Sequence, residues 1–151
     1  MHFYYDIAYS VINNTEGMMV NIYNNKKPNV LDGISLYLDA GWGVARDYAG
    51  AQKTFDEAYK NSHFITAIDN DKLVGMIRYF TDGFHDTQII ECIVLKSYQK
   101  QGIAKAMLNE LKELHSGTAI YIQSTENYKE AFIKEGFKKH QLVGLSFLKK
   151  R

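Results

Sequence analysis

The sequence lacks the features that mark several large classes of protein. Its one cysteine, Cys92, excludes a disulfide within the chain. No apolar run approaches the roughly 20 residues of a transmembrane helix, and no signal peptide is visible. The net charge of +1 argues against nucleic acid or an acidic membrane as partner, because both attract basic proteins. The five histidines lack the spacing of metal ligands. We therefore expect a cytoplasmic protein without a bound metal.

The residues that are present fit one folded domain over residues 1–151. Hydrophobic residues make up 46% of the chain and charged residues 23%, as in globular proteins, and no repeat or linker divides it. Alternating patterns predict strands over residues 3–11, 20–23, 63–68, 72–81, 87–95 and 118–123, and one or two antiparallel strands over 137–148. Helical spacing predicts helices over residues 32–40, 47–60, 102–114 and 126–135, the first capped by Asp32 and ended by Gly41.

The order of these elements indicates the fold class. Two strands joined by a hairpin at Asn70-Asp71 are antiparallel. The strand, helix and strand over residues 87–123 imply a parallel pair with a right-handed crossover. We expect an α+β, three-layer fold: a mixed, mainly antiparallel sheet with a parallel central pair and about four flanking helices.

The most informative stretch is residues 90–108. A β-branched apolar run ends at Leu95, and a polar loop that contains Gly102 leads into an amphipathic helix. The first N–H groups of a helix lack partners within the helix, and its dipole is positive there. A strand that enters a helix through such a loop is therefore a candidate phosphate site. The alternative is an ordinary strand-to-helix loop.

Residues 99–104, Gln-Lys-Gln-Gly-Ile-Ala, fit the pattern Gln/Arg-x-x-Gly-x-Gly/Ala. Around them lie Leu36-Tyr37, Gly41-Trp42, the segment 72–78 and Gly136-Phe137. This order resembles the GNAT acetyltransferase superfamily, and its small bacterial members most. The resemblance covers about residues 20–142 and leaves the first 17 outside. Lys96 departs from the pattern, because relatives usually carry proline there.

The resemblance implies an N-acetyltransferase that uses acetyl-CoA as co-substrate. In the family, the loop wraps the CoA pyrophosphate with backbone N–H groups, and the pantetheine arm pairs with the open edge of the preceding strand. The thioester would lie where residues 90–95 and 118–123 splay apart. The expected cofactor contacts are Ile93, Val94, Gln99, Lys100, Gln101, Gly102, Ile103 and Ala104.

Glu91 is the candidate base for the proton of the attacking amine. Strand alternation places it on one face with Ile89 and Ile93. A carboxylate among apolar side chains is costly unless it is paired or functional, and desolvation makes a carboxylate more basic. The alternative is an ion pair with Arg78, and both can hold. A β-bulge near Glu91 would change the face that it uses.

The resemblance also assigns the other catalytic groups. The backbone N–H of Val94 would stabilise the oxyanion. Relatives commonly carry a tyrosine as general acid where this chain has Phe132, which cannot donate a proton. Tyr128, one helical turn earlier, or Tyr121 would have to supply the acid, and Phe132 would pack on the pantetheine. The alternative for both tyrosines is core packing.

The acceptor pocket is expected at two loops. An aromatic wall with carboxylates suits a cationic amine, and exposed loop residues without a function are the alternative. The expected residues are Trp42, Asp47, Tyr48, Asp82, Phe84, His85 and Asp86. The first strand would extend the sheet edge or contact a second subunit in a homodimer. A start at Met18 or Met19 is the alternative for that segment.

Three functions remain open from the sequence. The first is acetyl transfer to a small-molecule amine or a protein amino group. The second is an acyl-CoA-binding module that has lost catalysis, which Phe132 suggests. The third is an interaction protein that binds no CoA.

Overall fold

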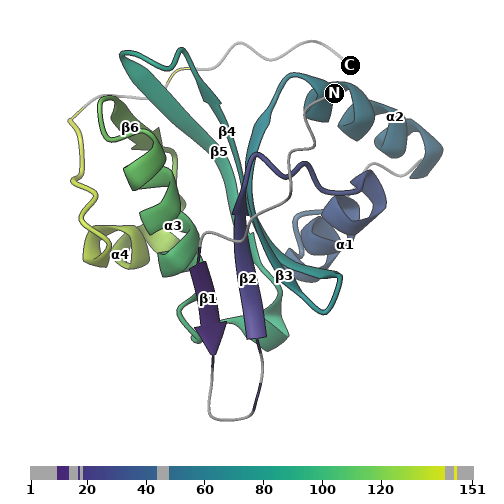
Figure 1. Ribbon diagram of the computed structural model, residues 1–151. Coiled ribbons are helices and arrows are strands. Elements are labelled where there is room, and N and C mark those ends of the chain that lie inside the picture. The colour runs from purple at the N-terminus through teal and green to yellow at the C-terminus, as the bar shows by residue number, and fades with distance from the viewer. Residues whose placement is uncertain (1–9, 14–16, 18, 44–47, 142–144, 146–151) are drawn as a thin grey trace, which may run out of the picture.

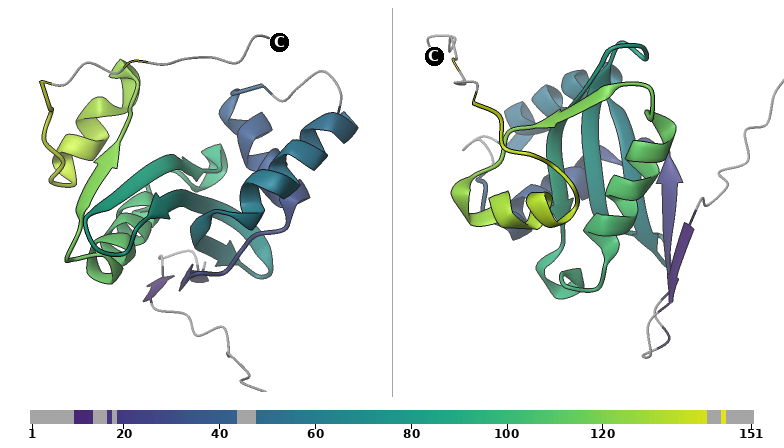
Figure 2. Two further views of the ribbon diagram at one scale, coloured as in Figure 1. Left: turned by 90° about the horizontal axis from the view of Figure 1, so that it is seen from above. Right: turned by 90° about the vertical axis from the view of Figure 1, so that its left-hand side faces the viewer.

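The computed structural model describes residues 10–13, 17, 19–43, 48–141 and 145. Its described part forms a six-stranded sheet in the order β1 to β6, with α1 and α2 on one face and α3 and α4 on the other (Figures 1 and 2). The elements are β1 (Ser10–Asn13), β2 (Met19–Asn24), α1 (Val30–Ala40), α2 (Tyr48–Lys60), β3 (His63–Asp69), β4 (Lys72–Thr81), β5 (Asp86–Val94), the 3₁₀ helix η1 (Lys96–Tyr98), α3 (Ile103–Leu114), β6 (Ala119–Ile122) and α4 (Glu126–Lys134).

The sheet confirms the predicted mixed, mainly antiparallel topology, but its parallel pair lies at one end of the described strand order and not at its centre. Strands β1 to β5 pair antiparallel in sequence order, and β5 pairs with β6 in parallel through the crossover helix α3. The parallel register runs from Asp86 opposite Ala119 to Ile89 opposite Ile122. Beyond Ile89, β5 continues to Val94 without a partner on β6, and β6 diverges from it (Figure 2). One edge of β5 is therefore open along its second half.

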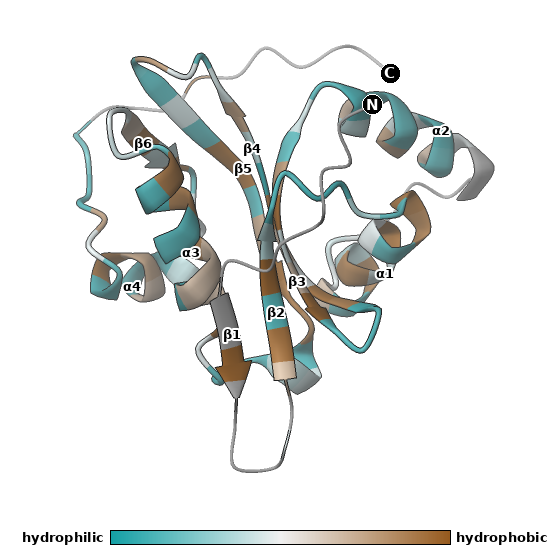
Figure 3. Cartoon of the chain, viewed as in Figure 1, coloured by the Kyte–Doolittle hydropathy of each residue, from teal (hydrophilic) through white to brown (hydrophobic). Residues whose placement is uncertain are grey.

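Each face of the sheet has its own apolar core. On one face, α3 contributes Ile103, Met107 and Leu111 to a cluster with strand residues such as Ile77 and Ile89. On the other face, a second cluster lies under α1 and α2, with members Leu36, Tyr59, Phe64, Leu73, Met76 and Ile93. Apolar residues concentrate on the central strands in Figure 3, while polar residues are frequent on the helices.

Helix α1 begins earlier than the sequence pattern predicted. Asn29 is its N-cap, and its side-chain oxygen accepts the N–H of Leu31 at 2.8 Å. The prediction of Asp32 as the cap was wrong, because Asn29 supplies an equally good acceptor one turn earlier. Asp32 lies instead in the first turn, where its charge complements the helix dipole. Gly41 ends the helix in the left-handed region, as predicted.

Other predicted elements hold with small shifts in their bounds. The β3–β4 hairpin turns at Asn70 and Asp71, which both have positive φ. Of the predicted first strand, residues 10–13 form β1, which extends the sheet edge by pairing with β2, while residues 3–9 lie outside the described part. Residues 137–141 contain no strand, contrary to the prediction, and most of residues 142–148 lie outside the described part. No helix among the described residues could cross a membrane.

Candidate active site

A β-bulge in β5 decides which face Glu91 uses. Arg78 on β4 lies opposite Glu91, and the next residue, Tyr79, lies opposite Ile89. Ile90 is therefore the extra residue, as in a bulge. It reverses the alternation, because Ile89 packs in the α3-side core while Ile93 packs under α1. Glu91 thus shares a face with Ile93 as expected, but not with Ile89.

The side chain of Glu91 forms a two-point ion pair with Arg78. Arg78 Nη2 donates to Glu91 Oε1 at 2.6 Å, and Arg78 Nε donates to Oε2. Each side chain is 12% exposed, and Arg78 Nη1 also donates to Ser62 Oγ at 3.0 Å. The ion-pair alternative is therefore confirmed. The ion pair still allows Glu91 to act as a base, because a carboxylate has about four acceptor sites and Arg78 uses two of them.

Tyr37 of α1 connects Glu91 to the predicted substrate wall. Burial, together with a hydrogen bond to Glu91, raises the pKa of Tyr37 far above its ordinary value, so the hydroxyl stays protonated. Its ring packs edge-on against Trp42 at 5.5 Å between centroids. Trp42 is 47% exposed. The structure thus places an exposed aromatic ring one side chain away from the candidate base.

The open edge of β5 carries the backbone groups of Val94. Leu95 N–H donates to Val74 O at 2.9 Å, and successive residues of a strand direct their backbone groups to opposite edges. The N–H of Val94 therefore faces away from β4, toward the open edge. Its carbonyl oxygen accepts the side-chain amide of Gln99 at 3.0 Å. This orientation agrees with the predicted oxyanion donor.

Ile93 does not fit its predicted cofactor role. By the same alternation its backbone groups face β4, where its carbonyl oxygen lies 3.2 Å from the Cβ position of Gly75. Its side chain is 4% exposed in the core under α1 and α2. Cys92 and Val94 instead direct their backbone groups to the open edge, where the Val94 carbonyl accepts the Gln99 side chain. The Cys92 side chain packs on the face opposite Glu91, and burial raises the pKa of its thiol to about 12.

Residues 96–102, which we call the cofactor loop, have the predicted phosphate-site geometry. Lys100 and Gly102 both have positive φ, 62° and 83°. Gly102 is the N-cap of α3 and provides no side-chain cap, so the first N–H groups of the helix, at Ile103 and Ala104, are available to a ligand. The side chain of Ile103 is buried in the core, which fixes the helix start, whereas Ala104 is exposed.

The cofactor loop is held by side chains at both ends. Lys96 N–H donates to Asp39 Oδ2 on α1 at 2.7 Å, and the hydroxyl of Tyr98 donates to Asp69 Oδ2 at 2.9 Å. The side chain of Gln101 donates to the carbonyl of Ser97 at 3.2 Å. At Lys96, where related sequences usually have proline, this chain therefore uses an N–H that proline would lack.

The candidate general acids lie apart from Val94. Tyr121 on β6 lies opposite Gln88, six residues before Val94 on β5 and so roughly 15–20 Å away along the strand. Tyr128 is 52% exposed on α4. Neither is a buried core residue, so the core-packing alternative is wrong for both. Phe132 packs edge-on against Phe137 at 5.8 Å between centroids and shares with Tyr121 a hollow of about 810 Å³ that Glu91 and Val94 do not line.

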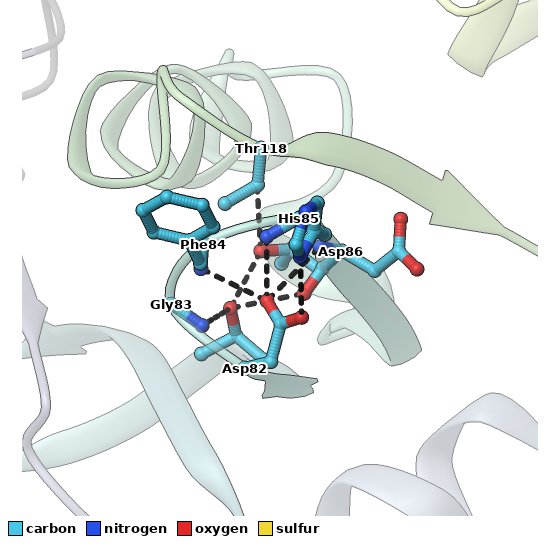
Figure 4. A network of polar contacts seen from close by, with 8 residues as sticks. Asp82, Gly83, Phe84, His85, Asp86 and Thr118 are labelled. Carbon is cyan, nitrogen blue, oxygen red and sulfur yellow. Dashed lines mark hydrogen bonds and ion pairs between the residues drawn. The ribbon is translucent and has the colours of Figure 1, made fainter.

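Asp82 stabilises the β4–β5 turn (Figure 4). Its Oδ1 accepts the backbone N–H groups of Phe84, His85 and Asp86 at 2.8–3.1 Å. These bonds lower the pKa of Asp82 to about 2. Its carboxylate is thus already engaged by the turn, which argues against the predicted contact with substrate. The His85 side chain is 75% exposed, and its Nδ1 lies 3.6 Å from Asp82 Oδ2.

Two of the predicted residues fall where the structure gives no side-chain description, and three residues of the site make contacts that the sequence did not predict. Asp47 and the side chain of Tyr48 lie outside the described part of the chain. Sequence reasoning missed Asp39, Ser62 and the role of Tyr37. Their contacts join elements far apart in the chain, so a periodic pattern carries no signal for them. No group of three metal-ligating side chains occurs in the part of the chain that the structure describes.

Similarity to known proteins agrees with this geometry. A family model for the acetyltransferase (GNAT) family matches residues 20–134. A protein of unknown function from meticillin-resistant Staphylococcus aureus superposes with a TM-score of 0.73 at 23% identity, over 87% of this chain and 100% of that one. A GNAT-family acetyltransferase from Streptococcus pneumoniae gives 0.73 at 24%, over 88% and 100%.

A more distant structure is an aminoglycoside N-acetyltransferase in complex with CoA. It superposes with a TM-score of 0.66 at 14% identity, over 91% of this chain and 99% of that one. No curated protein matched the sequence. At these identities the structural likenesses show the fold.

Proposed function

Because the chain belongs to the acetyltransferase (GNAT) family, we propose that it is an acetyl-CoA-dependent N-acetyltransferase. The acceptor is a primary amine, either of a small molecule or of a protein, which attacks the thioester directly. An aminoglycoside N-acetyltransferase with CoA bound is among the structures of similar fold. Amines of that kind are therefore the first acceptors to test.

One observation carries this proposal: the open edge of β5 leads directly into the cofactor loop. The N–H of Val94 faces that edge, because Leu95 N–H is the group that pairs with β4. Eight residues further on, Gly102 opens α3 with uncapped N–H groups. An extended arm with amides could pair along the edge, and a phosphate group could bind at the helix start. CoA combines both features in one molecule.

The residues of the chain supply the following steps. Acetyl-CoA, when bound, provides the thioester carbon at which the amine forms a C–N bond as the C–S bond breaks. The N–H of Val94 donates to the carbonyl oxygen as negative charge develops on it. Glu91 accepts the proton that the amine loses, while Arg78 keeps the carboxylate oriented. The thiolate can leave without a strong acid, since a thiol has a pKa of about 8.5.

A second candidate function is an acyl-CoA-binding module that has lost catalysis. Two observations favour it. Phe132 lacks a hydroxyl, and Tyr121 lies opposite Gln88 rather than near Val94. Both functions predict CoA binding, so only turnover separates them.

The test measures release of free thiol from acetyl-CoA with a panel of amines between pH 7 and 9. We expect wild-type turnover with at least one amine. Glu91→Gln should lower kcat by about 10²- to 10⁴-fold, the usual contribution of a general base, and CoA binding should persist. Glu113→Gln, an exposed position on α3, is the matched control. CoA binding without thiol release for any amine would favour the binding module.

A further inference from the structure

We propose that Asp39 is a positioning residue for the cofactor loop, and this inference rests on the proposed function. Its carboxylate fixes the residue at which the chain leaves the sheet. Lys96 N–H donates to Asp39 Oδ2 at 2.7 Å, across 57 residues of sequence. A hydrogen bond to an ionised carboxylate is shorter and stronger than a neutral one.

Lys96 is the pivot between β5 and the cofactor loop. The residue before it, Leu95, makes the last backbone bond to β4, with its N–H on Val74 O at 2.9 Å. The carbonyl of Lys96 accepts the N–H of Gln99 at 3.3 Å, which closes the 3₁₀ turn. The N–H of Lys96 has left the ladder, and Asp39 supplies its acceptor. Both backbone groups of the pivot are thereby fixed.

Helix α1 is a rigid support for this contact. Ile34 and Leu36 on α1 are fully buried, and the left-handed Gly41 closes the helix two residues after Asp39. Tyr37 of the same turn lies in the environment of Glu91, whose carboxylate adds to burial in raising the pKa of the Tyr37 hydroxyl. One helical turn therefore touches both the candidate base and the start of the cofactor loop. It fixes the position of one relative to the other.

This contact should affect how strongly the loop binds CoA. The entry to the loop helps to set the orientation of the backbone around Lys100 and Gly102, which both adopt left-handed φ values. Without Asp39, the loop must be ordered when CoA binds, and that ordering reduces affinity. We expect Asp39→Ala to raise the Kd of CoA about three- to tenfold, as loss of one hydrogen bond predicts.

The experiment uses calorimetry to titrate CoA into the full-length wild type and four variants. These are Asp39→Ala, Asp39→Asn, Lys96→Pro and the double variant that combines Asp39→Ala with Lys96→Pro. Because a side-chain amide still offers an oxygen acceptor, Asp39→Asn should restore most of the affinity. Proline has no N–H to donate and fixes a φ that a 3₁₀ turn already uses. Leu95, with ψ of 137°, suits a following proline. In the Lys96→Pro background, Asp39→Ala should therefore change the Kd less than about 1.5-fold, since the bond that it removes is already absent.

Asp32→Ala, which removes the other carboxylate of α1, controls for charge, and melting curves confirm that each variant folds. An unchanged Kd in Asp39→Ala would overturn the inference. So would an equal effect of Asp39→Ala in the Lys96→Pro background, since it would show that the carboxylate acts elsewhere. If the wild type itself binds no CoA, the proposed function fails. If the wild type binds CoA and Asp39→Ala binds it equally well, only the inference about Asp39 fails.

Discussion

The absence of a side chain at Gly33 allows Tyr59 to be buried. A Cβ added at Gly33 would lie 2.1 Å from the Tyr59 hydroxyl oxygen and 3.0 Å from its Cζ. Tyr59 is 1% exposed, its hydroxyl contacts the sulfur of Met76, and its ring packs against Phe55 and Phe64. The ring cannot move aside without disturbing the core that supports α1.

We expect Gly33→Ala to lower the free energy of unfolding by about 1–3 kcal/mol, because overpacking outweighs the better helix propensity of alanine. Urea unfolding measures the change. Ser35→Ala, at an exposed position of the same helix, is the control. Adding Tyr59→Phe should recover part of the loss, since the closest atom is then removed. Stability equal to wild type in Gly33→Ala would contradict the packing described.

Some contacts of single residues could be predicted from the sequence, and others could not. The pairing of Glu91 with Arg78 could be predicted, because a buried carboxylate needs a partner. The bond from Tyr37 could not, because it depends on how α1 packs on the sheet. The same holds for Asp39, whose partner lies 57 residues away.

At the scale of elements, the bulge at Ile90 sets the geometry of β5. Alternation read from sequence alone placed Ile89, Glu91 and Ile93 on one face, and a one-residue insertion reverses the face from that point. The elements themselves were predictable, because the hydrophobic periods of β3, β4 and α3 are long and regular. The strand expected after Gly136 is absent from residues 137–141.

The β4–β5 turn provides a prediction for pH. Backbone N–H bonds lower the pKa of Asp82 to about 2, below its ordinary value of 3.8. A carboxyl group with a lowered folded-state pKa stabilises the protein above its unfolded pKa and loses that effect as the pH falls through the folded value. Asp82→Asn keeps the acceptor oxygen but cannot titrate.

The melting temperature of wild type should therefore exceed that of Asp82→Asn above about pH 4, and the difference should shrink between about pH 4 and pH 2. Thermal melts of both proteins from about pH 7 to pH 2.5 measure it. Asp56→Asn, an exposed change on α2 and outside the turn, is the control variant. A difference that stays constant across the range would show that the turn does not depend on the charge.

At the scale of the whole molecule, the helical layers on the two faces of the sheet support different parts of the candidate site. Helices α1 and α2 support Glu91, Tyr37 and Trp42, whereas the uncapped start of α3 forms part of the proposed phosphate site. The sheet lies between them (Figure 1). The divergence of β6 opens the edge of β5 along which both halves meet. The loop and helix start proposed for the cofactor were predictable from one local motif, while the proposed acceptor side depends on contacts between layers.

The most direct test of the account is calorimetric titration of acetyl-CoA into wild type, Gly102→Ala and Gly83→Ala. Both glycines have positive φ and open space at the Cβ position, so alanine strains the backbone similarly at each. At Gly102, however, the methyl group would also occupy the approach of the pyrophosphate. We predict saturable binding to wild type, binding at least tenfold weaker to Gly102→Ala, and affinity within twofold of wild type for Gly83→Ala. No binding to wild type, or equal losses in the two variants, would contradict the account.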